Sequence, residues 1–300
     1  LLTLDIGTYY VNKGLSNSEI ASLSRSQHQS QGFGSTGTRG SQIEYLEFLE
    51  GDFPKDKNVF DGINTTWSRV EGGVEIGKIL TNVQNNFNFK NPSASISELV
   101  KAYQLIKQLD DKHWKTIKLN EIKSIIEACS GLYLEAVANN SSTTPGSKNT
   151  IKIEAISRSD FNIELKSVVI NPLKLVENKN VKLLNNEAQL FSLNVEIPAE
   201  IIQTFPYWLN EKGSLGMYKV TNTDLISSPE SPRAIFAEFT LDFNGVSIPF
   251  SKEIIYKYND PVKGEVYQPF EILPEISASF KEKVYIFSDN NAQKISVKVK

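Results

Sequence analysis

The stretch QGFGSTGTRG, residues 31–40, contains glycines with the spacing of a phosphate-binding loop: Gly32, Gly34 and Gly37. In a dinucleotide-binding fold, this G-x-G-x-x-G pattern follows a buried strand and opens a helix whose N-terminus binds the pyrophosphate. The residues before it, LSRSQHQSQ, are polar, and no acidic residue ends a second strand about 20 residues later. The sequence therefore disfavours a nucleotide site. It predicts a turned connector whose glycines let the backbone approach a neighbour closely.

Two arginines, Arg25 and Arg39, lie on either side of this stretch, and we expect a helix to begin at Ser41. Guanidinium groups and a helix N-terminus both attract negative charge, so an anion site is one interpretation and a solvated surface loop is the other. His28 is one of only two histidines, and Cys129 is the single cysteine. A zinc site cannot be assembled from these few histidine and cysteine ligands without heavy use of carboxylates.

A second candidate site is the aromatic stretch FPYWLNEKGSLGMY, residues 205–218, in which Tyr207 and Trp208 are adjacent. Flat aromatic rings suit the faces of sugar rings, so a carbohydrate-stacking platform is one interpretation of this pair. The alternative is that both rings cap the hydrophobic core of a β domain.

Composition limits the classes of function. The chain has 300 residues, 40% of them hydrophobic, which is typical of a globular protein with two or so domains. Its formal net charge is −3, and acidic and basic residues are mixed along the chain, so we expect no nucleic-acid partner. No apolar run approaches the length of a membrane span, so none is predicted.

Hydrophobic periodicity predicts helices in the first half of the chain. Two short helices, each with a capping box, are expected at 16–27 and 41–51. Three longer amphipathic helices are expected at 73–87, 95–109 and 120–138. Their apolar stripes must pack against one another or against a neighbouring domain.

From Thr150 the hydrophobic pattern alternates with a period of two, which predicts strands, and Asn244-Gly245 predicts a hairpin turn. The predicted fold class is α+β multidomain, with a helical segment followed by an antiparallel Ig-like β-sandwich. The expected domains are listed here in chain order: 1–52, the tail of a deacetylase-like α/β domain; 53–144, a helical segment; 145–272, the Ig-like sandwich; 273–300, the start of a second, truncated sandwich.

The segment EIASLSRSQHQSQGFG, residues 19–34, resembles the A-L-x-x-H-x-S-Q segment of the PIG-L/LmbE superfamily. This segment lies near the end of the family's catalytic domain, and the family consists of zinc-dependent de-N-acetylases that act on N-acetylglucosaminyl conjugates. The matching positions are Leu23, His28, Ser30 and Gln31. Three later stretches, PGSKNTIKIEAISRSD, FPYWL and YNDPVKGEVYQPFEILP, are also similar to large bacterial members with a helical segment and Ig-like modules.

The family's zinc ligands and catalytic residues lie in an A-H-P-D-D-E motif and a later histidine pair, and neither occurs in this sequence. No catalytic residue or metal ligand is therefore carried over. The resemblance implies that the four matching residues either support the structure or contact the metal ligands without binding the metal themselves. It implies the C-terminal, non-catalytic part of an exported deacetylase, found in the periplasm or at the cell surface. The part we expect here contains no cofactor, and its partners are a glycan and the missing catalytic domain. The alternative function is a stand-alone glycan-binding or adhesion module.

Overall fold

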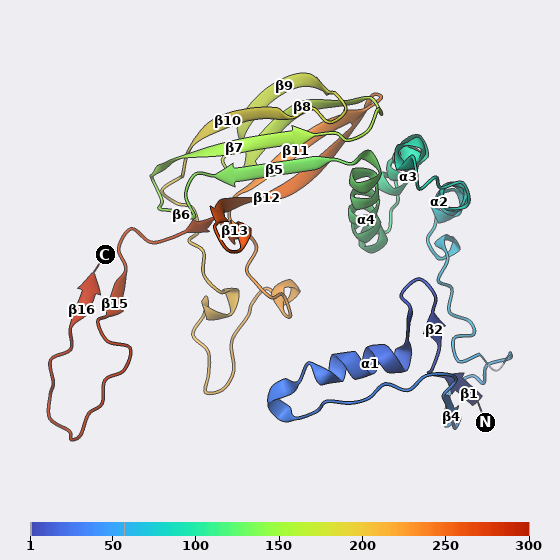
Figure 1. Ribbon diagram of the computed structural model, residues 1–300, viewed down its shortest axis with the longest axis horizontal. Coiled ribbons are helices and arrows are strands. Elements are labelled where there is room, and N and C mark those ends of the chain that lie inside the picture. Colours follow the sequence, from blue (N-terminus) through green and yellow to red (C-terminus); the bar gives the residue numbers. More distant parts are fainter. Residues whose placement is uncertain (1, 57, 300) are drawn as a thin grey trace. The chain divides into compact units, whose positions relative to one another are not determined.

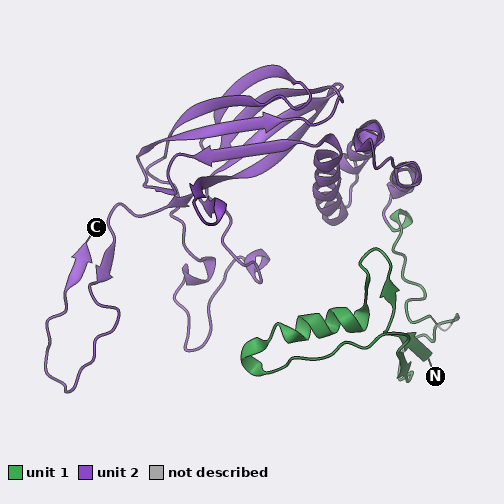
Figure 2. Ribbon diagram, viewed as in Figure 1, with its two compact units in different colours: residues 1–69 green, residues 70–300 purple. Residues whose placement is uncertain are grey.

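A computed structural model describes residues 2–56 and 58–299 of the chain (Figure 1). The backbone divides into two compact units, Leu1–Arg69 and Val70–Lys300 (Figure 2). The boundary between these units lies at 69/70, whereas the sequence-based domain boundaries lie at 52, 144 and 272. Among the described residues, strands predominate and the four α-helices are grouped in the first half of the chain.

Unit 1 is built from short elements. They are β1 (Leu2–Asp5), β2 (Tyr9–Tyr10), β3 (Leu15–Ser16), α1 (Asn17–Ser26), the 3-10 helix η1 (Gln29–Gln31), β4 (Ile43–Leu46) and the 3-10 helix η2 (Trp67–Arg69). Strand β1 pairs antiparallel with β4, and β2 pairs with β3 in a hairpin. Of the ten described residues of α1, none is buried.

The two short helices predicted for unit 1 have different outcomes. The first is confirmed as α1, and its capping box forms because the Ser16 hydroxyl accepts from the Glu19 N–H while the Glu19 side chain accepts from the Ser16 N–H. The second, at 41–51, is wrong, because residues 43–46 form strand β4. The Ser41 hydroxyl, expected to cap a helix, instead donates to the Asp5 carboxylate at 2.7 Å and so fastens β4 beside β1.

Three α-helices open unit 2. They are α2 (Gly73–Asn85), α3 (Ile96–Lys107) and α4 (Lys112–Ser130), with the 3-10 helix η3 (Pro92–Ser95) between the first two. The predictions at 73–87 and 95–109 are confirmed. None of the helices in the described ranges is long and apolar enough to cross a membrane.

The prediction of a helix at 120–138 is wrong at both ends. Helix α4 already begins after Asp111, whose carboxylate accepts a hydrogen bond from the Trp114 N–H at 3.0 Å. It ends at Gly131, which adopts a left-handed conformation with φ 59°. The residues beyond this glycine form a strand. On the sheet side, the Lys123 ammonium donates to the Pro249 carbonyl at 3.2 Å, which fastens α4 to the sheet.

Unit 2 contains one large sheet. Its strands are β5 (Tyr133–Ala138), β7 (Lys148–Ile156), β8 (Ile163–Asn171), β9 (Leu175–Leu183), β10 (Gln189–Glu196), β11 (Phe236–Phe243), β12 (Val246–Asp260) and β13 (Gly264–Pro269). The order is β10-β7-β5-β12-β11-β8-β9, with β13 also paired to β12. Outside this sheet, β6 (Ser142–Thr143) pairs in parallel with β14 (Glu271–Ile272), and β15 (Ala278–Phe280) pairs with β16 (Val297–Val299). The 3-10 helices η4 (Tyr207–Leu209) and η5 (Thr223–Leu225) lie between β10 and β11.

The fold-class prediction of an antiparallel Ig-like β-sandwich is wrong. Strand β12 is 15 residues long, and it pairs with β11 through its first half and with β13 through its second. It also pairs in parallel with β5, where Ile254 faces Ala136. The sheet therefore curves continuously, as Figure 1 shows. The edge strands β9 and β10 approach each other, since the Lys179 ammonium lies 3.9 Å from the centre of the Phe191 ring. The result is a nearly closed, barrel-like sheet of mixed strands.

The core of unit 2 is formed by side chains of this sheet and of helices α2, α3 and α4, among which Ile96 is fully buried. Strands β7 and β11 alternate strictly between buried and less buried residues, and Ile153 and Phe239 are among the fully buried side chains. Burying each such side chain contributes about 1.5–3 kcal/mol. The predicted hairpin at Asn244-Gly245 is confirmed, with φ values of 50° and 93° at the two turn residues.

Candidate functional site

The glycine-rich stretch packs back along helix α1. A Cβ atom on Gly37 would lie 3.0 Å from the Cα atom of Glu19, so only a glycine fits there without displacing the helix backbone. The Ser22 hydroxyl donates to the Ser35 carbonyl, and the Arg39 guanidinium lies 2.9 Å from the Glu19 carboxylate. The neighbour that this connector approaches is therefore α1 itself.

The structure does not bring the two arginines to one anion site. Arg39 pairs with Glu19 in the first turn of α1, whereas Arg25 lies in the last turn with its guanidinium 5.4 Å from the centre of the Phe33 ring. Six helical positions separate the two contacts, or about 9 Å along the axis. Ser41 precedes a strand, so the helix N-terminus expected beside Arg39 is replaced by extended backbone.

The residues of the family-like motif lie on the surface of unit 1. Leu23 is 55% exposed. Ser30 and Gln31 belong to η1, which His28 precedes, and the His28 ring Nδ1 lies 3.3 Å from the Arg25 carbonyl oxygen. Within residues 2–56 and 58–299, no group of three or more His, Cys, Asp or Glu side chains could hold a metal ion. The described residues therefore offer no ligand cluster for the zinc ion of the PIG-L/LmbE superfamily that the sequence resembles.

Unit 1 has a cavity of about 550 Å³ whose carboxylates already have partners. The Ser41 hydroxyl and the N–H groups of Gln42 and Gly7 all donate to Asp5, and these hydrogen bonds lower the pKa of its carboxyl. Donation from the Ser16 N–H, with smaller help from Arg39, likewise lowers the pKa of Glu19. Both carboxylates are tied to the turns around them.

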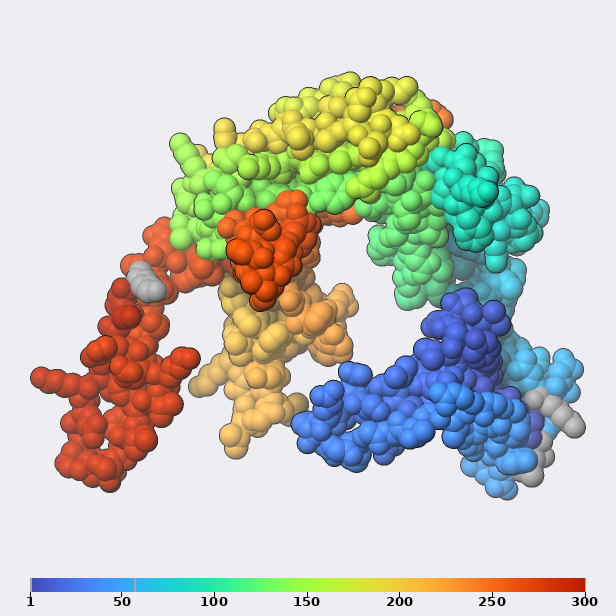
Figure 3. Space-filling view, in the orientation of Figure 1, coloured from blue at the N-terminus to red at the C-terminus, as the bar shows by residue number. Residues whose placement is uncertain are grey.

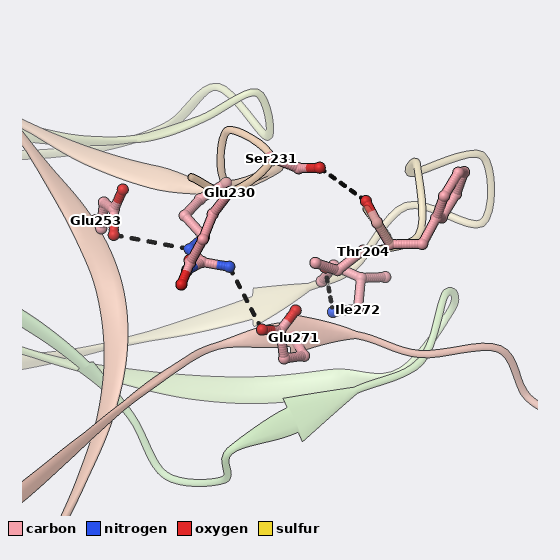
Figure 4. Close-up of polar contacts among 8 residues, drawn as sticks. Thr204, Glu230, Ser231, Glu253, Glu271 and Ile272 are labelled. Carbon is pink, nitrogen blue, oxygen red and sulfur yellow. Dashed lines mark hydrogen bonds and ion pairs between the residues drawn. The ribbon is translucent and has the colours of Figure 1, made fainter. Parts of the chain in front are cut away.

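In unit 2 the long connection between β10 and β11, residues 197–235, projects away from the sheet (Figure 3). It is fastened to β14, because the Thr204 N–H donates to the Ile272 carbonyl at 2.8 Å and the Ile272 N–H donates to the Thr204 hydroxyl at 2.9 Å. The Ser231 hydroxyl donates to the Phe205 carbonyl at 2.8 Å and joins the outgoing and returning halves of the connection (Figure 4). The connection contains two neighbouring cavities, and Thr204, Phe205 and Ser231 belong to the walls of both.

The larger of these two cavities, which we call the apolar cavity, has a volume of about 500 Å³. Most of its wall consists of proline, aliphatic and aromatic side chains, among them Pro198, Ile201 and Leu225. The Tyr207 ring belongs to this wall, and its hydroxyl donates to the Ser228 carbonyl at 3.1 Å. Tyr207 therefore holds the connection together as well as lining the cavity.

The smaller one, which we call the charged cavity, has a volume of about 350 Å³ and contains Trp208, Glu230, Arg233 and Glu271 in its wall. The Arg233 guanidinium is in contact with the Glu230 carboxylate and lies 3.4 Å from that of Glu271. Its third carboxylate neighbour is Glu253, at 3.7 Å, which is outside the cavity wall (Figure 4).

Tyr207 and Trp208 do not form one flat platform. Their ring centres are 4.9 Å apart and their planes are inclined by 86°, so the edge of one ring meets the face of the other. Because the two residues are consecutive in η4, their rings line different cavities. The sequence pointed to the two aromatic residues but missed Arg233 and its carboxylates, since the three glutamates are spread over 230–271.

No protein-family model and no curated protein matches the sequence. Among solved structures, the chain is similar to the alkylpurine DNA glycosylase AlkC of Pseudomonas fluorescens bound to DNA containing an abasic site analog, with 8% identity and a TM-score of 0.22. The match covers 64% of this chain and 50% of that one, so it spans about half the length of the glycosylase. A likeness this low carries no argument about fold or function.

Proposed function

We propose that unit 2 is a non-catalytic glycan-recognition module and that the glycan binds in the charged cavity beside Trp208. The resemblance to the PIG-L/LmbE superfamily adds that the module serves a zinc-dependent deacetylase domain of the same protein. Its ligand is then a glycan that contains N-acetylglucosaminyl units.

The observation that carries this proposal is the combination of groups in one cavity wall. The indole of Trp208 offers a flat apolar surface, which suits the C–H face of a sugar ring. Glu230 and Glu271 offer carboxylate oxygens that accept hydrogen bonds from sugar hydroxyls. A mainly apolar wall with a few placed polar groups is the usual composition of a small-molecule site, and about 350 Å³ lies at the small end of the range for such sites.

The experiment is a calorimetric titration of the full chain with a partially de-N-acetylated chitin oligosaccharide. Trp208→Ala is expected to weaken binding at least about tenfold, because truncating a central aromatic anchor costs about 2 kcal/mol or more and a tenfold change corresponds to about 1.4 kcal/mol. Leu209→Ala is the matched control, since Leu209 is the next residue of η4 and lines neither cavity. Unchanged affinity in Trp208→Ala, or no binding by the unaltered chain, would refute the proposal.

The non-catalytic part of the proposal has a separate test. The chain, purified and supplied with Zn²⁺, should neither retain stoichiometric zinc nor release acetate from N-acetylglucosaminyl oligosaccharides. Turnover or stoichiometric zinc would overturn it. An A-H-P-D-D-E motif encoded upstream in the same reading frame would favour the deacetylase parent, and its absence there would favour the stand-alone module.

A further inference from the structure

The charged cavity has more negative than positive charge. Its wall contains one guanidinium, that of Arg233, and two carboxylates, those of Glu230 and Glu271, so one formal negative charge remains in the wall. Glu253, outside the wall, is a third carboxylate beside the same guanidinium and adds a second negative charge nearby. Among the described residues that line this cavity, Arg233 is the one cation. A positively charged ligand therefore reduces the net negative charge in the cavity, whereas an anionic ligand increases it.

The arginine is not available to bind an anion. Its side chain is 13% exposed, and all three of its contacts with carboxylates are already made within the chain. The carboxylates are more accessible, with 65% of the Glu230 side chain and 30% of the Glu271 side chain exposed. They keep oxygen atoms that can accept hydrogen bonds from a ligand.

The indole of Trp208 also favours a positively charged ligand, through a different physical effect. The face of an indole carries negative electrostatic potential and attracts ammonium groups, and this indole stands in the same wall as the two carboxylates. An aromatic face beside uncompensated carboxylates is a combination that favours a cationic group over a neutral one.

We propose that the charged cavity binds sugar units with a free, protonated amino group, that is, glucosamine units in preference to N-acetylglucosamine units. This inference rests on the proposed function and specifies its ligand. The ammonium group of such a unit is held by Glu230 and Glu271, and the ring of the same or the next unit packs on Trp208. An N-acetyl group is neutral and presents one N–H donor, so it gains none of the charge attraction.

The experiment compares two ligands on the unaltered full chain: fully de-N-acetylated and fully N-acetylated chitin oligomers of equal length. Titrations are made at about pH 6, below the usual pKa of an amine of this type. The de-N-acetylated oligomer is expected to bind about tenfold more tightly at low salt, with the preference shrinking as salt is added.

Two charge-neutralising variants test whether the preference for the de-N-acetylated oligomer arises in the charged cavity. Glu230→Gln should reduce it about threefold or more, a smaller factor than the loss of the whole site. Glu253→Gln removes the same charge from the same arginine but outside the cavity wall, and should leave most of the preference intact. Thermal unfolding of both variants shows whether they are folded, and if one is not, the comparison of ligands on the unaltered chain still decides.

The outcomes separate this inference from the proposed function. Equal or tighter binding of the N-acetylated oligomer would overturn the inference and leave glycan recognition standing. Binding of neither oligomer would overturn both. A preference for the amino form that survives Glu230→Gln unchanged would overturn the assignment of the ammonium group to this cavity.

Discussion

Replacing Lys257 by methionine should destabilise unit 2 through a carboxylate left without its cation. The Lys257 ammonium lies 2.6 Å from the carboxylate of Glu135, whose side chain is only 9% exposed. Removing one partner of a fully buried ion pair costs about 3–5 kcal/mol. Since a quarter of the Lys257 side chain is exposed, solvent reduces this cost, and we expect about 2–3 kcal/mol at neutral pH.

The assay is urea unfolding followed by far-UV circular dichroism. Lys166→Met is the matched control, because Lys166 pairs with Glu164 at 2.9 Å on the same sheet with both side chains about a third exposed. That variant should cost less than about 1 kcal/mol. Adding Glu135→Gln to Lys257→Met should recover part of the loss. The reasoning is refuted if Lys257→Met costs no more than Lys166→Met.

The same pair predicts how stability changes at high pH. Burial lowers the pKa of Lys257, but the hydrogen bond and charge of Glu135 outweigh this, so the pKa lies above its ordinary value. Burial, followed by the hydrogen bond with Glu135, raises the pKa of Tyr133. A group whose pKa is raised by folding adds to the free energy of unfolding. This contribution is fully present at a pH below the pKa of the group in the unfolded state, and it is lost as the pH rises through the pKa in the folded state. Unfolding free energy should therefore fall above about pH 10, and fall less steeply in Lys257→Met.

Three further predictions concern the local structure. Asp111→Ala removes the N-cap of α4 and should cost about 1 kcal/mol in urea unfolding, and a cost near zero would contradict the observed cap. Gly245→Val places a β-branched residue at φ 93° and should lower stability by about 1–3 kcal/mol, whereas an unchanged midpoint would mean that the turn is built differently. Amide hydrogen exchange should be fast in α1, which has no buried residue, and slow in β11; equal protection of the two would refute the contrast.

Local signals in the sequence were sufficient where a side chain caps its own element. The Ser16–Glu19 box identified α1, and Asn244-Gly245 identified the β11–β12 hairpin. At Ser41 the same signal failed because the hydroxyl found a partner outside its own segment, at Asp5. The apolar spacing after Asn120 also failed, since it continues through Gly131 into β5 and does not show that the backbone changes conformation there.

The sheet and the candidate site depend on contacts between distant residues. Alternation predicts that β12 is a half-buried strand, but it does not show that this strand pairs in parallel with β5, whose residues were predicted as helix. Nor does it show that β12 pairs with β11 through its first half and with β13 through its second. Likewise, the aromatic residues of η4 were found because they are adjacent in the sequence. The carboxylates around Arg233 come from separate parts of the chain, so only the folded backbone brings them together.

The central claim is that a glycan binds in the charged cavity, and the indole N–H signals of the chain test it most directly. The sequence has three tryptophans, so a ¹⁵N-labelled sample gives three such signals, and Trp208→Phe identifies one of them by its loss. Adding the de-N-acetylated oligosaccharide should shift the Trp208 signal in a saturable way and leave those of Trp67 and Trp114 in place. An unmoved Trp208 signal, with the other two shifted or not, would contradict the account.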